Sequence, residues 1–403
     1  MTEKASFTMS SAPNPLQENI VIVSAARTPM GGFQGNLSSI TAVDLGTIAI
    51  QSALERAGVA PEDVSEVLMG CVLPAGTGQG PARQSALHAG IPDHVPATTV
   101  NKICGSGMKT VMLGATQLKT GEADLVVAGG MESMTNAPYL LDKARGGMRL
   151  GHGQVKDHMF TDGLEDAYQG VAMGVFAQAT ADRFGLGREA MDDYALASLE
   201  RASKAISSGA FAEEIVPVET RKGLVDIDEQ PGKARPEKIR QLRPAFSKDG
   251  TVTAANSSSI SDGAAALVLM RESDAAAQGL QPLARIIGYQ SHAQKPEEFT
   301  IAPVDCIRKL LKKINWQASE VDLFEVNEAF AVVAMMAIRE LRLDHDKVNI
   351  HGGACALGHP LGASGARILV TLLHALNKTS GTKGIASLCI GGGEATAIAV
   401  EML

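Results

Sequence analysis

The amino-acid sequence predicts an α/β fold made of two similar halves that are joined by an insertion. Three observations carry this prediction. Short apolar segments of β type alternate with helical patterns, which is typical of βαβ units around a parallel sheet. Several motifs of the first part recur in the same order near the C-terminus. Residues 135–258, between the two sets, differ from both because long stretches lack strand patterns.

The first part of the chain alternates strands and helices. An apolar run at residues 20–24 predicts a strand, and residues 42–58 show helical periodicity that ends at a glycine, a common C-terminal signal. Residues 64–69 predict the next strand, and residues 106–119 predict a helix. Residues 123–128 are apolar apart from Asp124 and predict a strand that ends in Gly-Gly.

An internal repeat is the most informative feature of the organisation. In each copy, Ser-Gly precedes an apolar helical pattern, and an apolar strand ends in glycines with a glutamate beyond. Three matches in one order predict two related α/β halves. The paired segments are CGSGMKTVM from Cys104 and GASGARILV from Gly362, LVVAGGMES (residues 125–133) and SLCIGGGEA (residues 387–395), and SEVLMGC (residues 65–71) and VDLFEVN (residues 321–327).

The insertion at residues 135–258 is rich in glycine, proline and charge. Its segment DKARGGMRLGHGQ, residues 142–154, predicts an exposed loop. Such a loop can be a flexible connector. A long insertion inside a compact protein is more often a lid or a binding surface.

Composition excludes several classes of protein. The chain has 403 residues, of which 45% are hydrophobic and 20% charged, which predicts two or three domains with a large core. The formal net charge of −8 disfavours a nucleic-acid-binding protein. The five cysteines include no CxxC pair, which disfavours a disulfide framework or a zinc site and fits a reducing compartment.

The sequence also carries no targeting or membrane signal. The first 19 residues lack the apolar stretch of a signal peptide and the arginines of a transit peptide. No apolar run reaches the roughly 20 residues that a membrane helix needs. We therefore expect a soluble, cytoplasmic protein that binds neither membranes nor nucleic acid.

Cys104 is the first candidate for chemistry, because it precedes Gly-Ser-Gly and a helical pattern. A cysteine at a helix N-terminus faces unpaired N–H groups and the positive end of the helix dipole, and both stabilise the nucleophilic thiolate. The adjacent glycines let a substrate approach the backbone. The alternative is a small buried cysteine at a packed turn.

Three further polar residues lie at the ends of predicted elements. His359, in GHPLGASG, is expected at a loop tip, where it can act as base to a cysteine or be purely structural. Cys389 ends an apolar strand before three glycines and faces a ligand site or the core. Asn327 follows the LFEV strand and holds a water or an oxyanion, or caps the helix that is expected from about Ala329.

Taken together, the motifs resemble those of the thiolase family, from about Ile20 onward and in the family's order. This resemblance implies two βαβαβαββ halves in a layered αβαβα core, with a loop domain inserted in the first half. It implies a first half at residues 1–134 and 260–281, an inserted domain for coenzyme A binding and oligomerisation at 135–259, and a second half at 282–403. The motifs are VSAARTP at Val23, NKICGSGMK at Asn101, GGMESMTNAPY at Gly129, LRPAF at Leu242, NEAF at Asn327, GHPLGASGAR at Gly358 and CIGGG at Cys389.

The resemblance assigns a role to each candidate residue. Cys104 would accept the acyl group, and His359 would take its proton and later form an oxyanion site with a water held by Asn327. Cys389 would remove a proton from a second acetyl-CoA. The N–H groups of Cys104 and Gly391 would form the other oxyanion hole, in which one donor is typically worth about 3–4 kcal/mol.

Coenzyme A would lie across the inserted domain. The resemblance places Ser258, Ala254, Phe246, Leu164 and Met173 along the pantetheine channel, with Ala329, Phe330 and Phe299 at its deep end. The family does not fix the basic residues that hold the phosphates, and the candidates from this sequence are the cluster Lys233, Arg235, Lys238 and Arg240. One departure concerns the channel: many biosynthetic relatives carry His-Met where this chain has Ala172-Met173.

The resemblance implies an acetyl-CoA C-acetyltransferase that reversibly converts two acetyl-CoA to acetoacetyl-CoA and CoA, without a cofactor or metal, as a homotetramer or homodimer. A 3-ketoacyl-CoA thiolase of fatty-acid breakdown, with a roomier acyl pocket, is the main alternative. A decarboxylating condensing enzyme would lack the second cysteine. A non-catalytic CoA- or lipid-binding homologue would not need nucleophile, base and acid together.

Overall fold

The first half of the chain forms one side of a mixed sheet. The structure, a computed structural model, describes residues 18–403. Strands β4, β3 and β5 are parallel neighbours, and β10 and β1 follow in antiparallel pairing. The strands and helices expected between residues 20 and 119 are present, with small shifts at their ends. They are β1 (Ile20–Arg27), α1 (Ala42–Ala57), β3 (Glu66–Gly70), α2 (Pro81–His88), β4 (Ala97–Val100), α3 (Ser106–Thr120), β5 (Leu125–Ser133) and β10 (Ser261–Arg271).

The second half repeats this arrangement. Its strands follow the order β12-β13-β14-β11, and a parallel bridge between Phe324 and Val348 stands at the place of β4 in the first half. Strands β1 and β11 pair over two residues of each strand, which joins the two sides. The elements are β11 (Ala284–Ala293), α9 (Ala302–Ile314), β12 (Leu323–Val326), α10 (Ala331–Leu341), α12 (Leu361–Thr379), β13 (Lys383–Ile390) and β14 (Glu394–Met402).

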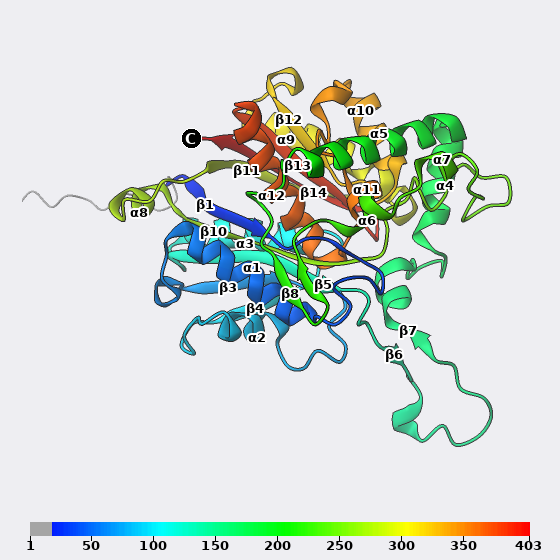
Figure 1. The fold of residues 1–403 in the computed structure, drawn as a ribbon, viewed down its shortest axis with the longest axis horizontal. Helices are drawn as coiled ribbons and strands as arrows, with labels where there is room; N and C mark the ends of the chain where they lie inside the picture. Colours follow the sequence, from blue (N-terminus) through cyan, green and yellow to red (C-terminus); the bar gives the residue numbers. More distant parts are fainter. Residues whose placement is uncertain (1–17) are drawn as a thin grey trace, which may run out of the picture.

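The core consists of five layers. One hydrophobic cluster surrounds α3 and α12, a second joins α1 to the outer face of the first half's strands, and a third joins α9 and α10 to the outer face of the second half's strands. In Figure 1 the blue and cyan elements of the first half lie below the yellow to red elements of the second. This layering confirms the predicted thiolase-like αβαβα fold.

Helices α3 and α12 approach each other through equivalent glycines of the repeat. A Cβ added to Gly107 would lie 2.8 Å from the backbone nitrogen of Ala366, and one added to Gly365 would lie 2.4 Å from that of Met108. Neither position has room for a methyl group. The Ser-Gly motif therefore recurs because each half supplies one helix to a single close crossing.

The strand predicted at residues 123–128 continues through the two glycines to Ser133, so its predicted end was wrong. A Cβ on Gly129 would lie 2.1 Å from the carbonyl oxygen of Ala265, and one on Gly130 would lie 2.0 Å from that of Gly362. The glycines sit inside the strand because other backbones pass close to it.

The stretch between β5 and β10 contains the 20-residue helix α5, which the sequence did not predict. All residues from 142 to 154 are exposed, as expected, and Figure 1 shows this segment extending away from the core. The predicted domain boundaries stay a prediction. The elements here are β6 (Tyr139–Leu140), β7 (Lys156–Asp157), α4 (Met173–Phe184), α5 (Arg188–Ser207), β8 (Val218–Thr220), β9 (Gly223–Val225), α6 (Glu229–Lys233) and α7 (Pro236–Ile239).

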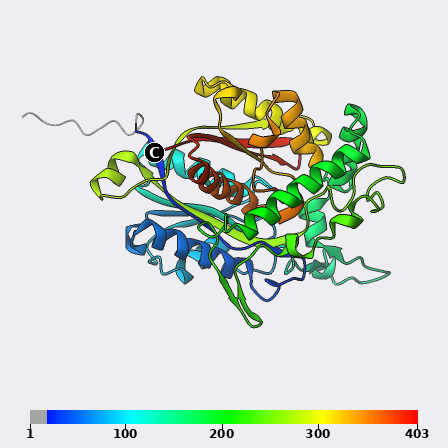
Figure 2. The same cartoon turned by 45° about the horizontal axis from the view of Figure 1, so that its top comes forward.

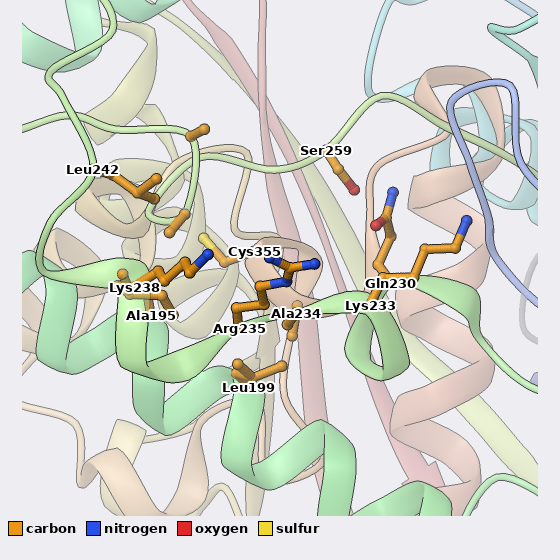
Figure 3. Close-up of a pocket in the computed structure, with 14 residues that line it drawn as sticks. Ala195, Leu199, Gln230, Lys233, Ala234, Arg235, Lys238, Leu242, Ser259 and Cys355 are labelled. Atoms are coloured by element: carbon orange, nitrogen blue, oxygen red, sulfur yellow. The ribbon is translucent and has the colours of Figure 1, made fainter.

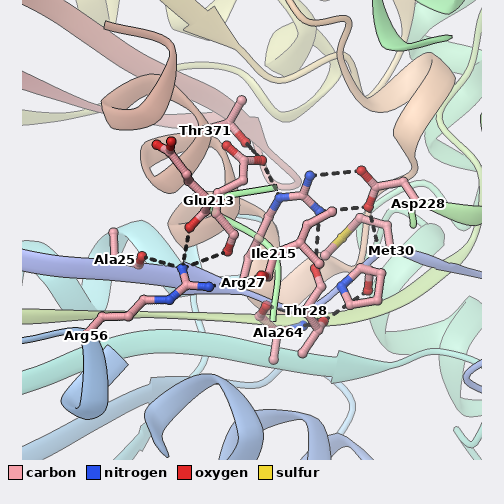
Figure 4. Close-up of polar contacts among 12 residues, drawn as sticks. Ala25, Arg27, Thr28, Met30, Arg56, Glu213, Ile215, Asp228, Ala264 and Thr371 are labelled. Atoms are coloured by element: carbon pink, nitrogen blue, oxygen red, sulfur yellow. Dashed lines mark hydrogen bonds and ion pairs between the residues drawn. The ribbon is translucent and has the colours of Figure 1, made fainter. Parts of the chain in front are cut away.

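A buried ion network fastens this stretch to β1. The guanidinium of Arg27, which is 0% exposed, donates from Nε to Glu214 at 2.5 Å and from both Nη atoms to Asp228 at 2.7 and 2.8 Å (Figure 4). Glu214 also accepts from the hydroxyl of Thr371 on α12 at 3.1 Å. The two carboxylates raise the pKa of Arg27 although burial acts in the opposite direction. The Arg of the VSAARTP motif thus has a structural role.

Within residues 18–403, no helix is both long and apolar enough to cross a bilayer. The expectation about a targeting sequence falls mainly on residues 1–17, which lie outside the described residues.

We predict that Arg27→Met lowers the free energy of unfolding by about 3–5 kcal/mol, because it leaves two carboxylates buried without their partner. Urea unfolding of the full chain measures this value. The control is Arg183→Met, which breaks a pair with Glu298 whose side chains are 59% and 30% exposed and should cost less than about 1 kcal/mol. Equal, small losses for both variants would contradict the role of the Arg27 network.

Candidate active site

An apolar pocket of about 420 Å³ lies where the two halves meet the inserted stretch. Its walls come from the loop before α3, the loop before α12, the turn after β13 and the insertion. All eight residues that the sequence assigned to the pantetheine channel line this pocket, together with Cys104, His359, Gly391 and Ala172. The eight are Ser258, Ala254, Phe246, Leu164, Met173, Ala329, Phe330 and Phe299.

Cys104 sits in a strained turn at residues 101–105, which we term the Cys104 turn. The preceding residue, Ile103, has φ of 49°, a left-handed conformation that is costly for a β-branched side chain. The side chain of Asn101 accepts the Ile103 N–H at 2.9 Å, and the Ser106 hydroxyl donates to the Ile103 carbonyl at 2.7 Å. These contacts hold the backbone that presents Cys104 directly before α3.

Burial decides the protonation state of Cys104. It raises the pKa of the thiol to about 11, although the backbone N–H groups of Gly391 and of Cys104 itself act in the opposite direction. The helix start therefore does not produce a resting thiolate, because burial outweighs the expected stabilisation of the thiolate by the helix N-terminus. The two N–H groups converge on the sulfur and can donate hydrogen bonds that stabilise negative charge developing beside it.

His359 is poised as a neutral base. Its Nδ1 lies 2.5 Å from the hydroxyl oxygen of Ser364, which donates its own proton to the Pro360 carbonyl at 2.8 Å. Nδ1 must then carry the ring proton, so Nε2 has a free lone pair. Burial, with a smaller contribution from the charge of Arg367, lowers the pKa of His359 to about 3 and keeps the ring neutral.

Asn327 lies close to His359 but does not cap a helix. Helix α10 begins at Ala331, and Phe330 precedes it, so the capping alternative for Asn327 was wrong. The Asn327 amide nitrogen lies 3.5 Å from Nδ1 of His359. Within residues 18–403, Asn327 Oδ1 and His359 Nε2 are both buried and have no hydrogen-bond partner. A buried polar atom without a partner suits a bound water or a ligand oxygen.

Cys389 is fully buried near the end of β13 and is not among the residues that line the pocket. Burial, and then the proximity of Cys104, raises the pKa of this thiol well above its ordinary value. The two cysteines, one from each half, are therefore close enough for a charge on one thiol to interact electrostatically with the other.

Three of the four basic residues predicted to contact the phosphates, Lys233, Arg235 and Lys238, line a second pocket of about 350 Å³. Ala254 and Ser259 line both pockets, so the basic pocket adjoins the apolar one. Figure 3 shows Lys233 pointing away from Arg235 and Lys238, and its ammonium group pairs with Glu229.

Arg240, the fourth member of the basic cluster, pairs with Asp193 and does not line this pocket. No cluster of His, Cys, Asp and Glu within residues 18–403 suits a metal ion.

Sequence reasoning missed Ser364, which orients His359. The repeat contains the signal, since Ser364 and Ser106 are equivalent serines. Each forms hydrogen bonds with the backbone or side chain of the turn that precedes its helix.

Comparisons with known proteins agree over nearly the whole chain. Family models for the thiolase N-terminal domain and the thiolase C-terminal domain match residues 20–273 and 280–402. Acetyl-CoA acetyltransferase 2 of Arabidopsis thaliana is 52% identical, over 98% of this chain and 99% of its own length. The acetyl-CoA acetyltransferase of Escherichia coli (strain K12) is 51% identical, over 96% of this chain and 100% of its own.

A solved structure supports the same relationship. The Acat5 thiolase from Ascaris suum, in complex with coenzyme A, superposes with a TM-score of 0.92 at 42% identity, covering 96% of this chain and 100% of that one.

The pH dependence of Cys104 alkylation tests the neutral resting state. Because burial raises the pKa of the thiol to about 11, the rate with iodoacetamide should rise about tenfold per pH unit from about pH 6 to about pH 9. Peptide mass spectrometry assigns the adduct to Cys104. A plateau near neutral pH would instead indicate a preformed thiolate–imidazolium pair.

Proposed function

The chain belongs to the thiolase family and is an acyltransferase, and from this premise we propose that it joins two acetyl-CoA molecules reversibly into acetoacetyl-CoA and CoA. Relatives about 50% identical over nearly their full length carry the name acetyl-CoA acetyltransferase. The observation that carries the proposal is the convergence of the Cys104 thiol, the His359 imidazole and the Gly391 turn on one apolar pocket.

The first half-reaction forms an acetyl-enzyme. Nε2 of His359 takes the proton of Cys104, and the thiolate attacks the thioester carbonyl. The N–H groups of Cys104 and Gly391 stabilise the oxyanion, and Cys389 gives its proton to the departing CoA sulfur. A neutral thiol and a neutral imidazole suit this step, because the proton moves only when substrate is present.

The second half-reaction forms the carbon–carbon bond. The Cys389 thiolate removes a proton from the methyl group of a second acetyl-CoA. The enolate oxygen accepts hydrogen bonds from protonated His359 and from a water held by Asn327. The carbanion attacks the acetyl group on Cys104, and the leaving Cys104 thiolate recovers its proton from His359. Both cysteines and the histidine then regain their starting protonation states.

The two adjoining pockets support a path for coenzyme A. The apolar pocket would take the pantetheine arm. The basic pocket would take the phosphates, which Arg235 and Lys238 would bind. Lys233 would interact with the phosphates and with Glu229, its ion-pair partner. The reaction as written needs no cofactor or metal, since coenzyme A enters only as substrate and product.

Aromatic rings in the wall of the apolar pocket favour a short acyl group. Phe330 packs edge-on against Phe246 and Phe299, with ring centroids 6.1 and 6.3 Å apart. These rings support acetyl and acetoacetyl substrates over the longer chains of a fatty-acid-degrading thiolase. Ala172, where many biosynthetic relatives carry histidine, leaves the wall less crowded on one side.

We also propose that the protein is a cytoplasmic enzyme of lipid metabolism and assembles as a homotetramer or homodimer. The exposed segment at residues 142–154 supports the assembly, because Leu150 is 98% exposed and Tyr139, at its base, 68%. Light scattering on the full chain distinguishes either oligomer from a monomer.

We predict that Cys389→Ala separates the two half-reactions. The variant should still acquire an acetyl group from acetyl-CoA, though more slowly, because the departing CoA sulfur loses its proton donor. Condensation should slow by about 10²–10⁴-fold, because no positioned base remains for the methyl group of the second acetyl-CoA. Exchange of the acetyl-CoA methyl hydrogens with deuterated solvent should disappear in parallel.

The matched control for this prediction is Cys306→Ala, which removes another buried thiol that does not line the pocket and should leave both half-reactions intact. Condensation by Cys389→Ala at a rate near that of the wild type would assign the base to another residue.

A further inference from the structure

The Cys104 turn and the turn that carries Gly391 belong to different halves of the chain. Each turn supplies one of the two N–H groups that approach the Cys104 sulfur, so the distance between the turns determines the geometry of this donor pair. The Cys104 turn is anchored to its own half by Asn101 and Ser106. The partner is the turn at residues 391–393 between β13 and β14, which we term the glycine turn. Gly392 and Gly393 there have φ of 83° and 85°, a conformation that glycine adopts without strain. The Gly393 carbonyl accepts the N–H of Gln294 at 2.9 Å, which holds one side of this turn.

One ion pair bridges the two turns. The ammonium group of Lys102, in the Cys104 turn, contacts the carboxylate of Glu394, the first residue of β14. Glu394 pairs with Ile390 across the hairpin, so it closes the glycine turn directly. Among the ion pairs of residues 18–403, the Lys102–Glu394 pair is the one that connects the Cys104 turn with the strand that follows the glycine turn. We propose that the Lys102–Glu394 pair is a positioning device that sets the spacing of the Cys104 and Gly391 N–H donors.

The other half of the repeat contains an equivalent clasp. Glu132 occupies the place in the first half that Glu394 occupies in the second. Its buried carboxylate accepts the N–H of Gly362, at the start of α12, at 2.8 Å. The Glu132 carboxylate also accepts the N–H groups of Val72 and Leu73 in its own half. Each glutamate side chain thus reaches from its strand to the start of the middle helix, or to the turn before it, in the opposite half. Glu132 bonds the backbone directly, whereas Glu394 acts through Lys102.

Because the Lys102–Glu394 pair is partly exposed, its effect on the position of the turns can be tested separately from its effect on the stability of the fold. The side chains of Lys102 and Glu394 are 23% and 35% exposed and line a pocket open to water with Asp162 and Asp166. Pairs of this kind contribute little to the stability of a fold. Packing also joins the turns, because a Cβ on Gly105 would lie 2.3 Å from Cδ1 of Ile390. It is looser at the donor itself, where a Cβ on Gly391 would meet only Ile103 and Met173, at 3.6 and 3.7 Å. Loss of the pair should therefore alter the donor geometry while the fold stays intact.

Three variants test the proposal: Lys102→Met, Glu394→Gln and the double variant. Each should lower kcat for acetoacetyl-CoA formation about tenfold, the order expected when donors shift by a fraction of an ångström, with KM for acetyl-CoA nearly unchanged. The double variant should be no worse than either single variant, since the residues act as one pair. Exchanging the charges, with Lys102→Glu and Glu394→Lys together, should recover part of the loss.

The matched control is a lysine–glutamate pair at the other end of β13. Lys383 and Glu320 lie 3.5 Å apart, with side chains 26% and 46% exposed. Lys383→Met with Glu320→Gln should change the melting temperature as little as the test variants do and leave kcat unchanged. This comparison separates loss of a surface pair in general from loss of the tether.

The inference rests on the proposed function, and the experiment separates the two. A wild-type enzyme that does not form acetoacetyl-CoA overturns the proposed function itself. An active wild type with all three variants at its kcat overturns the positioning role alone. Strictly additive losses in the double variant would also overturn it, because they would show that Lys102 and Glu394 act independently.

Discussion

The close crossing of α3 and α12 is the constraint on which the rest of the structure depends. Gly107 and Gly365 leave no room for a methyl group, so the two helices meet backbone to backbone in the middle layer. Each helix follows a loop with a polar side chain, Cys104 in one half and His359 in the other. Bringing the helix starts together places both loops at one pocket. A repeated fold has thus produced a site that neither half contains alone.

Burial at this crossing determines the electrostatics of the site. Desolvation raises the pKa of both cysteine thiols and lowers that of His359, so all three groups rest in their neutral forms. Charge then appears only during reaction, where fixed N–H donors in a dry site stabilise it most effectively. The hydrogen bond from His359 to Ser364 serves the same end, because it leaves Nε2 free to receive a proton.

Much of the fold was predictable because local patterns and the repeat agreed. The Ser-Gly motifs before two helices indicated related halves, and the motif order indicated the family. Contacts between distant segments were less accessible. Gly129 and Gly130 looked like a strand end because the backbones that require them come from β10 and the start of α12. The Lys102–Glu394 pair joins residues 292 positions apart. The neutral state of Cys104 was missed because it reflects burial, which competes with the local effect of the helix start.

The location of the acetyl group after a single half-reaction tests the account most directly. The full-length enzyme is mixed with acetyl-CoA, quenched in acid and digested, and the cysteine peptides are weighed by mass spectrometry. We expect one acetyl group per chain, on the peptide that contains Cys104, and none on the peptide that contains Cys389. An acetyl group found only on Cys389, or no acetyl-enzyme at all in an active preparation, would contradict the division of labour between the two halves.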